Sequence, residues 1–258
     1  MIRLVSIFLS TILFLSLGCS QSSNSNDKKQ RLSKEKVIQI PFPIGFKKNS
    51  SEVYTGSKFS QLKNSWKKGL DKEESYLIIQ GHYYSNEENK SRSRNLGISR
   101  ASELKNILSK DLGPDRIVID SKKITAVFTE TWEDAYNISI KKGNINDLGY
   151  TETGEMFIIN YAKGSNISAI NDNISSRLSD IAEQMKSENI GANIICHTDK
   201  TSNPKGDYTL GKKLADEVKA YLVSKGVKKE ELRSSSMGSS QPETGESNRR
   251  IQLIFSSN

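Results

Sequence analysis

An internal repeat constrains the fold of this chain more than any other feature of its sequence. Residues 76–82 read YLIIQGH and residues 192–197 read ANIICH, so two short apolar runs each end in one of the only two histidines. Beyond them, residues 96–108 (LGISRASELKNIL) and 210–222 (LGKKLADEVKAYL) place apolar residues at the spacing of one helix face. A segment repeated in this way predicts two copies of one supersecondary unit.

The similarity between the two halves extends in both directions along the chain. Residues 36–42 and 156–161 have the composition of strands, and the helix expected after each one has an apolar face. These faces consist of Phe59, Leu62, Trp66 and Leu70 in the first half and of Ile174, Leu178, Ile181 and Met185 in the second. Gly113 and Gly226 are placed to end the later helices. Further strands are expected at 116–119, 132–140, 232–235 and 248–255.

This order of elements predicts an α+β fold with two tandem β-α-β-α-β-β units, each a two-layer sandwich with helices on one face of a small sheet. We place the first domain at residues 37–142 and the second at 156–258. Residues 143–155 are rich in Gly, Asn and Thr and are expected to be the linker. The alternative is one larger domain whose halves resemble each other by chance.

The N-terminus predicts export and attachment to a membrane. Arg3 precedes an apolar run over residues 4–17, which is too short for a comfortable span and fits a signal peptide. The run ends in LSLGC and resembles the signal of bacterial lipoproteins. That resemblance implies cleavage after residue 18, acylation of Cys19 with chains such as palmitate and, because Ser20 follows, the outer membrane. The alternative is an ordinary signal peptide or anchor. Polar residues 19–36 are expected to be a flexible tether.

Composition narrows the classes of function. Only 34% of the residues are hydrophobic, which excludes a protein with many membrane spans. Two cysteines exclude a disulfide scaffold, and two histidines make a histidine-based zinc site a poor fit. The net charge of +8 could indicate nucleic acid, but export separates the chain from it, so anionic lipid or the cell-wall polymer fits better. The sequence shows no catalytic motif, so we predict neither enzymatic activity nor a cofactor or metal.

Motifs in the second half carry a resemblance to a known family. Cys196-His-Thr-Asp199, Leu210-Gly-Lys-Lys-Leu-Ala215 and Asn248-Arg-Arg-Ile251 occur in order. They resemble the OmpA-like peptidoglycan-binding domain, whose strand ending GHTD is followed by a helix with L-S/G-x-x-R-A and by a late NRR strand. The first half resembles it more weakly, through Gly81-His82 and NLGISRA at residues 95–101.

The resemblance implies binding of the diaminopimelate in the peptidoglycan stem peptide. A carboxylate takes the ammonium of this zwitterion, and a guanidinium takes its carboxylate in two hydrogen bonds. Each half departs from the pattern, because Leu214 stands at the arginine position of the second half and Tyr84 at the aspartate position of the first. The residues that the resemblance assigns to ligand binding are Thr198, Asp199, Arg249 and Arg250 in the second half and Asn95 and Arg100 in the first.

Simpler roles compete with these assignments. Arg249 and Arg250 could merely flank the last strand. His82 and His197 are better explained as hydrogen-bonding residues at strand ends, and Cys196 as a buried free thiol.

Two functions therefore remain. The first is an outer-membrane lipoprotein, facing the periplasm, that links the membrane to peptidoglycan. The second is an envelope scaffold that binds other envelope proteins after losing the wall ligand.

Overall fold

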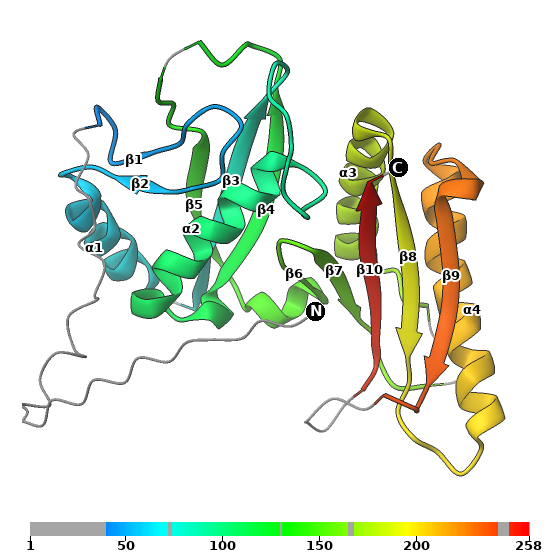
Figure 1. Ribbon diagram of the computed structural model, residues 1–258. Coiled ribbons are helices and arrows are strands. Elements are labelled where there is room, and N and C mark those ends of the chain that lie inside the picture. Colours follow the sequence, from blue (N-terminus) through cyan, green and yellow to red (C-terminus); the bar gives the residue numbers. More distant parts are fainter. Residues whose placement is uncertain (1–39, 72–73, 130, 165–167, 242–247, 258) are drawn as a thin grey trace, which may run out of the picture. The chain divides into compact units, whose positions relative to one another are not determined.

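A five-stranded sheet forms the framework of the second half (Figure 1). In spatial order the strands are β6 (Tyr150–Glu152), β7 (Met156–Asn160), β10 (Arg250–Ser257), β8 (Ile190–His197) and β9 (Leu232–Gly238), and the helices are α3 (Asp172–Glu188) and α4 (Pro204–Ser224). Strands β8 and β9 are parallel and are joined through helix α4, whereas the other neighbours in the sheet are antiparallel. Helix α3 connects β7 to β8.

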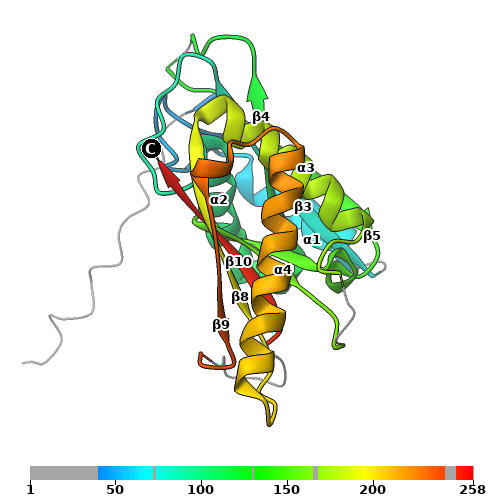
Figure 2. The ribbon, with the colours of Figure 1, turned by 90° about the vertical axis from the view of Figure 1, so that its right-hand side faces the viewer.

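Helices α3 and α4 cover one face of this sheet (Figure 2). Their apolar residues form the core together with those of the sheet. All four residues of the predicted α3 face are buried, together with Leu214 and Val218 of α4. The parallel β8–β9 pair requires a crossover, and α4 supplies it while covering the sheet. This half therefore has the two-layer arrangement expected from its periodicity.

The first half contains a smaller sheet of three strands, in which β3 (Ser75–Tyr84) lies between β4 (Ile117–Ile124) and β5 (Tyr136–Lys142). β3 pairs in parallel with β4 and antiparallel with β5. The helices that pack on this sheet are α1 (Phe59–Leu70) and α2 (Leu96–Leu112). β3 in the first half and β8 in the second thus each have one parallel and one antiparallel neighbour, with an α helix in the parallel crossover.

The computed structural model describes residues 40–71, 74–129, 131–164, 168–241 and 248–257. The expected signal peptide and tether, including Cys19, lie outside these residues. Among the described helices, none combines the length and the apolar character that crossing a membrane requires. The α+β class is confirmed, and the division into domains at 37–142 and 156–258 stays a prediction.

The strand predicted over residues 36–42 is wrong for the part that the structure describes. Residues 40–43 are not in a strand, and the chain instead forms β1 (Ile44–Gly45), which pairs with β2 (Tyr54–Thr55) in a separate sheet. Pro41 and Pro43 have no backbone N–H to donate to a strand ladder, which explains why this segment does not join the main sheet. β5 is therefore an edge strand of the smaller sheet.

The segment predicted as a linker is more ordered than its composition suggests. It contains a short 3-10 helix, η2 (Ile145–Leu148), and strand β6, which pairs antiparallel with β7. The ring of Tyr150 packs against that of Phe157 at 5.1 Å between centroids, so β6 is held by an aromatic contact as well as by the ladder. Residues 150–152 therefore belong to the second sheet.

A buried group of charged side chains connects elements of both halves. The Glu152 side chain is fully buried and forms ion pairs with Arg94, which precedes α2, and with Arg177 of α3, the latter at 2.6 Å. Arg177 also pairs with Asp120 of β4, and the Arg94 Nε donates to Gln184 Oε1 at 2.6 Å. The positive and negative charges alternate, so each buried charge has a partner of opposite sign.

Strand β3 and helix α2 approach each other through two glycines. A Cβ atom at Gly81 would lie 2.0 Å from the Gly97 carbonyl oxygen, and one at Gly97 would lie 2.5 Å from the Gly81 oxygen. Backbone atoms cannot give way at such distances without moving the helix. The glycine of YLIIQGH and that of LGISRA are therefore required by the same contact.

Replacement of Gly81 with alanine is expected to destabilise the protein by about 1–3 kcal/mol or more, because the added methyl group overpacks the β3–α2 contact. Urea unfolding monitored by circular dichroism measures this change. Gly154→Ala is the matched control, since its Cβ would meet only side-chain atoms of serines at 3.1 Å or more. Equal stabilities of the two variants would contradict the packing argument.

The variant Glu152→Gln tests the buried charge group. It removes the negative charge between Arg94 and Arg177 while keeping the shape of the side chain, and we expect a loss of about 3–5 kcal/mol, as for other broken buried pairs. The exposed pair between Lys212 and Asp216 provides the control, because Asp216→Asn should cost less than about 1 kcal/mol. Similar small losses for both variants would show that the cluster contributes little to stability.

Candidate ligand-binding site

A pocket of about 260 Å³ lies at one end of the larger sheet. β7 and β8 are both antiparallel to β10, which lies between them, so the carboxyl ends of β7 and β8 meet the start of β10. Tyr161, Asp199 and Arg249, which stand at these three strand ends, therefore come together. The complete lining is Tyr161, Lys163, Gly164, Thr198, Asp199, Thr201, Asp207, Leu210 and Arg249.

Asp199 is the carboxylate that this pocket presents with a fixed orientation. Its Oδ1 accepts the backbone N–H of Asn248 at 2.8 Å, and its Oδ2 is hydrogen-bonded to Arg249 Nη1. Burial alone would raise the pKa of the Asp199 carboxyl, but these hydrogen bonds and the positive charge of Arg249 lower it below its usual value. Asp199 is therefore ionised at neutral pH and has the charge that an ammonium group requires.

The neighbouring groups in the pocket are held by contacts to the sheet. The backbone N–H of Thr198 donates to the Gly238 oxygen at 2.9 Å, and the Tyr161 hydroxyl donates to the His197 oxygen at 2.5 Å. Burial raises the pKa of Tyr161 far above its usual value, so the phenol stays neutral. The buried Thr198 Oγ1 has no hydrogen-bond partner among the described residues, which leaves an unused polar atom beside the pocket.

Two residues of helix α4, Asp207 and Leu214, have their contacts within the protein. Asp207 accepts hydrogen bonds from the Thr201 hydroxyl at 2.6 Å, the Thr201 backbone N–H at 3.0 Å and the Ser239 hydroxyl at 3.1 Å. The Thr201 hydroxyl contributes most to lowering the pKa of the Asp207 carboxyl. Leu214 is fully buried in the core under α4. The arginine that the family pattern places at this position is replaced by an apolar core residue.

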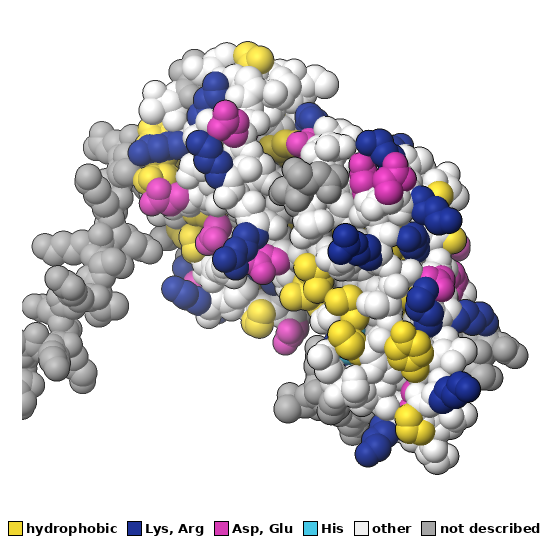
Figure 3. Space-filling model, turned by 45° about the vertical axis from the view of Figure 1, so that its right-hand side comes forward, with side chains coloured by type: hydrophobic (Ala, Val, Ile, Leu, Met, Phe, Trp, Pro, Cys, Tyr) yellow, Lys and Arg dark blue, Asp and Glu magenta, His cyan; other side chains and the backbone are white. Residues whose placement is uncertain are grey.

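The pocket nevertheless contains groups of both charges. Lys163 and Arg249 are its cations, while Asp199 and Asp207 are its anions. On the face drawn in Figure 3, Lys and Arg side chains are scattered among Asp and Glu side chains and form no single large patch. The charges that a ligand would meet in this pocket are therefore set by its lining residues and not by the net positive charge of the chain.

Of the four candidates in the second half, the structure brings together three. Thr198, Asp199 and Arg249 line the pocket, whereas Arg250, the next residue of the chain, does not. Arg250 is buried and its Nη1 donates to Asn248 Oδ1. Since successive residues of a strand point to opposite faces, Arg249 and Arg250 cannot share one site.

The two candidates in the first half are interior residues with intrachain partners. Asn95 is the N-cap of α2, and its Oδ1 accepts the Ile98 backbone N–H at 2.8 Å. Arg100 is fully buried, and its guanidinium pairs with Glu87 in two hydrogen bonds of 2.5 and 2.8 Å. Neither side chain reaches the surface in this structure, so neither is carried into the proposed binding site.

The simpler roles expected for two other residues are confirmed. The His197 Nε2 lies 3.0 Å from Gln252 Oε1 within the sheet, and the side chain is buried. Cys196 is a buried free thiol, and burial raises its pKa to about 11, which keeps it protonated and unreactive at neutral pH.

Sequence reasoning missed several pocket residues. Tyr161 and Lys163 follow β7 closely, and Thr201 lies in the loop after β8, so their positions at strand ends were the available signal. These residues could be predicted only by someone who also knew the strand order, because the end of β7 lies at this pocket through the pairing of β7 with β10.

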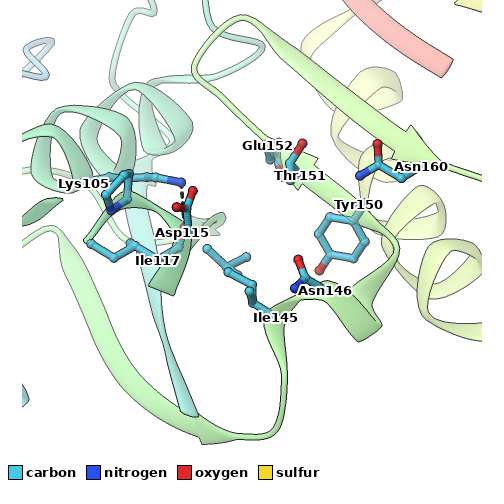
Figure 4. A pocket seen from close by; sticks show the side chains of 11 residues that line it. Lys105, Asp115, Ile117, Ile145, Asn146, Tyr150, Thr151, Glu152 and Asn160 are labelled. Atoms are coloured by element: carbon cyan, nitrogen blue, oxygen red, sulfur yellow. Dashed lines mark hydrogen bonds between the residues drawn. The ribbon is translucent and has the colours of Figure 1, made fainter. Parts of the chain in front are cut away.

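A second pocket, of about 200 Å³, lies between elements of the two halves. Figure 4 shows Lys105 and Asp115 on one side, with Tyr150, Glu152 and Asn160 on the other. The Lys105 ammonium already donates to the Ile117 oxygen at 2.7 Å, and Glu152 belongs to the buried ion-pair cluster. These charges are used within the protein, so the pocket at the end of the larger sheet is the better candidate.

Comparison with solved structures gives similarities restricted to part of the chain. The periplasmic domain of Helicobacter pylori MotB is 21% identical, covering 42% of this chain and 81% of that one, with a TM-score of 0.35. The peptidoglycan-associated lipoprotein from Burkholderia pseudomallei is 24% identical, covering 40% and 90%, with a TM-score of 0.36. The OmpA-like domain of FopA1 from Francisella tularensis is 15% identical, covering 42% and 79%, with a TM-score of 0.35. Comparison with curated proteins gives no match.

The family assignment rests on the sequence. Residues 164–251 match the model of the OmpA family. This range begins just after β7 and includes α3, β8, α4, β9 and the start of β10. It contains most of the pocket, with Asp199 and Arg249. The second half of the chain therefore carries an OmpA family domain at residues 164–251.

Proposed function

We propose that this chain is an outer-membrane lipoprotein that faces the periplasm and binds peptidoglycan non-covalently through its second half. The observation that carries the proposal is the pocket that joins Asp199 to Arg249 inside the OmpA family match. The protein would link the membrane to the cell wall without catalysing a reaction.

The chemistry of the pocket supports diaminopimelate of the stem peptide as the group recognised. Its far end carries an ammonium and a carboxylate. The Asp199 carboxylate can accept the ammonium, since two oxygens offer more acceptor sites than Asn248 and Arg249 use. Arg249 and Lys163, both lining the pocket, are the cations available to the ligand carboxylate in place of the arginine absent at Leu214.

Attachment to the membrane is proposed from the sequence of the N-terminus. Cleavage after residue 18 would expose Cys19 for acylation, and two or more acyl chains anchor a protein stably where one is marginal. The polar composition of residues 19–36 suits a tether between the lipid bilayer and the folded part.

The alternative function, an envelope scaffold that no longer binds the wall, is favoured by one specific observation. Leu214 is fully buried among apolar residues, at the position where the family pattern has an arginine. The site therefore has no guanidinium at this position. In that case other envelope proteins would be the partners. Replacing Leu214 with arginine would bury a charge in the core. Substitution of Asp199 is therefore the better experiment for distinguishing wall binding from the scaffold function.

Substitution Asp199→Ala is expected to reduce the fraction of protein that sediments with purified sacculi by about tenfold or more. Truncating one member of a hydrogen-bonded charge pair typically costs ~2–5 kcal/mol of binding free energy. The full mature chain is incubated with insoluble sacculi, and bound and free protein are separated by centrifugation.

Asp216→Asn is the control for this experiment, because Asp216 is an exposed carboxylate on α4 that does not line the pocket. It should sediment like the unmodified protein. Unmodified protein that stays in the supernatant would exclude wall binding and leave the scaffold function.

The lipid anchor has its own test. Cys19→Ala is expected to move the protein from the membrane fraction to the soluble fraction of the cell envelope, because the acceptor of the acyl chains is lost. Detection by immunoblot after fractionation measures the change, with Cys196→Ala as the control at a buried thiol. An unchanged distribution of Cys19→Ala would contradict lipid anchoring.

A further inference from the structure

The most completely satisfied charged group of the first half is the Arg100 guanidinium. All five of its N–H donors have acceptors. Nε donates to the Ser50 oxygen at 3.0 Å, Nη1 to the His82 oxygen at 2.9 Å, and Nη2 to the Lys47 oxygen at 3.1 Å. The remaining two donors bind the two oxygens of Glu87.

The Glu87 carboxylate is bound on two sides. Besides the two hydrogen bonds from Arg100, Oε1 accepts the Asn49 backbone N–H and Oε2 accepts the Tyr84 backbone N–H, both at 3.0 Å. Four donors therefore surround one carboxylate, and both partners of the ion pair are almost fully buried, with side-chain exposures of 0% and 1%. A bidentate guanidinium with two backbone amides is a geometry suited to any carboxylate.

Aromatic rings complete this environment. The Arg100 guanidinium carbon lies 5.3 Å from the ring centroid of Phe46 and 5.7 Å from that of Phe128. These contacts hold the guanidinium in place without using its N–H donors. The orientation of Arg100 is thus fixed by groups other than Glu87, namely two rings and three carbonyl oxygens.

Glu87 itself comes from the loop between β3 and α2. Its neighbours Asn86 and Glu88 are exposed, so a single side chain of this stretch enters the interior. From this geometry we infer that Arg100 Nη1 and Nη2 with the Asn49 and Tyr84 amides form a carboxylate-binding cradle that the chain closes with its own Glu87. A small external carboxylate is the ligand class that the cradle would accept if the Glu87 side chain were absent.

The inference concerns the first half only and is independent of wall binding by the second half. Its test uses Glu87→Ala in the full mature chain, with thermal unfolding measured in sodium formate, sodium acetate or sodium chloride at equal ionic strength and neutral pH. A ligand that binds the folded state raises the unfolding midpoint with the logarithm of its concentration. We expect formate and acetate to raise the midpoint of Glu87→Ala by several degrees over chloride.

Three proteins serve as controls. The unmodified chain and Glu87→Gln should show no difference between formate and chloride, because a side chain fills the cradle in both. The double variant Glu87→Ala/Arg100→Met should also lack the response, since it has no guanidinium. If Glu87→Ala is unfolded in chloride, its refolding in formate is the expected result. Equal midpoints in formate and chloride, or no refolding in formate, would overturn the inference.

Discussion

Pairing of carboxylates with guanidinium groups inside the chain decides which charged side chains remain available to a ligand. Glu87 binds Arg100 with both partners almost fully buried. Asp199 binds Arg249 at the border of a pocket, where the two side chains keep 30% and 24% of their exposure. The same chemistry therefore produces a closed site in one half and an accessible site in the other.

The two ion pairs differ in how readily their members can exchange partners, because one pair is buried and the other is partly exposed. A buried pair with all donors and acceptors used cannot exchange partners without exposing an uncompensated charge. A partly exposed pair keeps free acceptor positions on the carboxylate and can be rearranged by a zwitterion that brings both charges. The second half thus has the more accessible of these two ion pairs, while the first half uses its arginine internally and shares the Glu152 cluster with the second.

The fold was predictable from the sequence to the extent that it depends on local periodicity. The α3 face and the β8 strand follow from the spacing of apolar residues in the sequence, and the structure contains both. The Glu152 cluster was not predictable, because it joins side chains from four distant segments and no local pattern marks them. The short β6 strand was missed for a similar reason, since its order depends on pairing with β7. For the site, Asp199 follows from its motif, whereas the closure of Arg100 by Glu87 depends on a loop conformation.

Titration of the isotopically labelled mature chain with a soluble muropeptide containing diaminopimelate, followed by NMR, tests whether the second half recognises the wall. We expect saturable shifts of the backbone amides of Thr198, Asp199 and Arg249, with no shifts around Arg100. Shifts confined to the first half, or none at saturating muropeptide, would contradict the assignment of wall recognition to the second half.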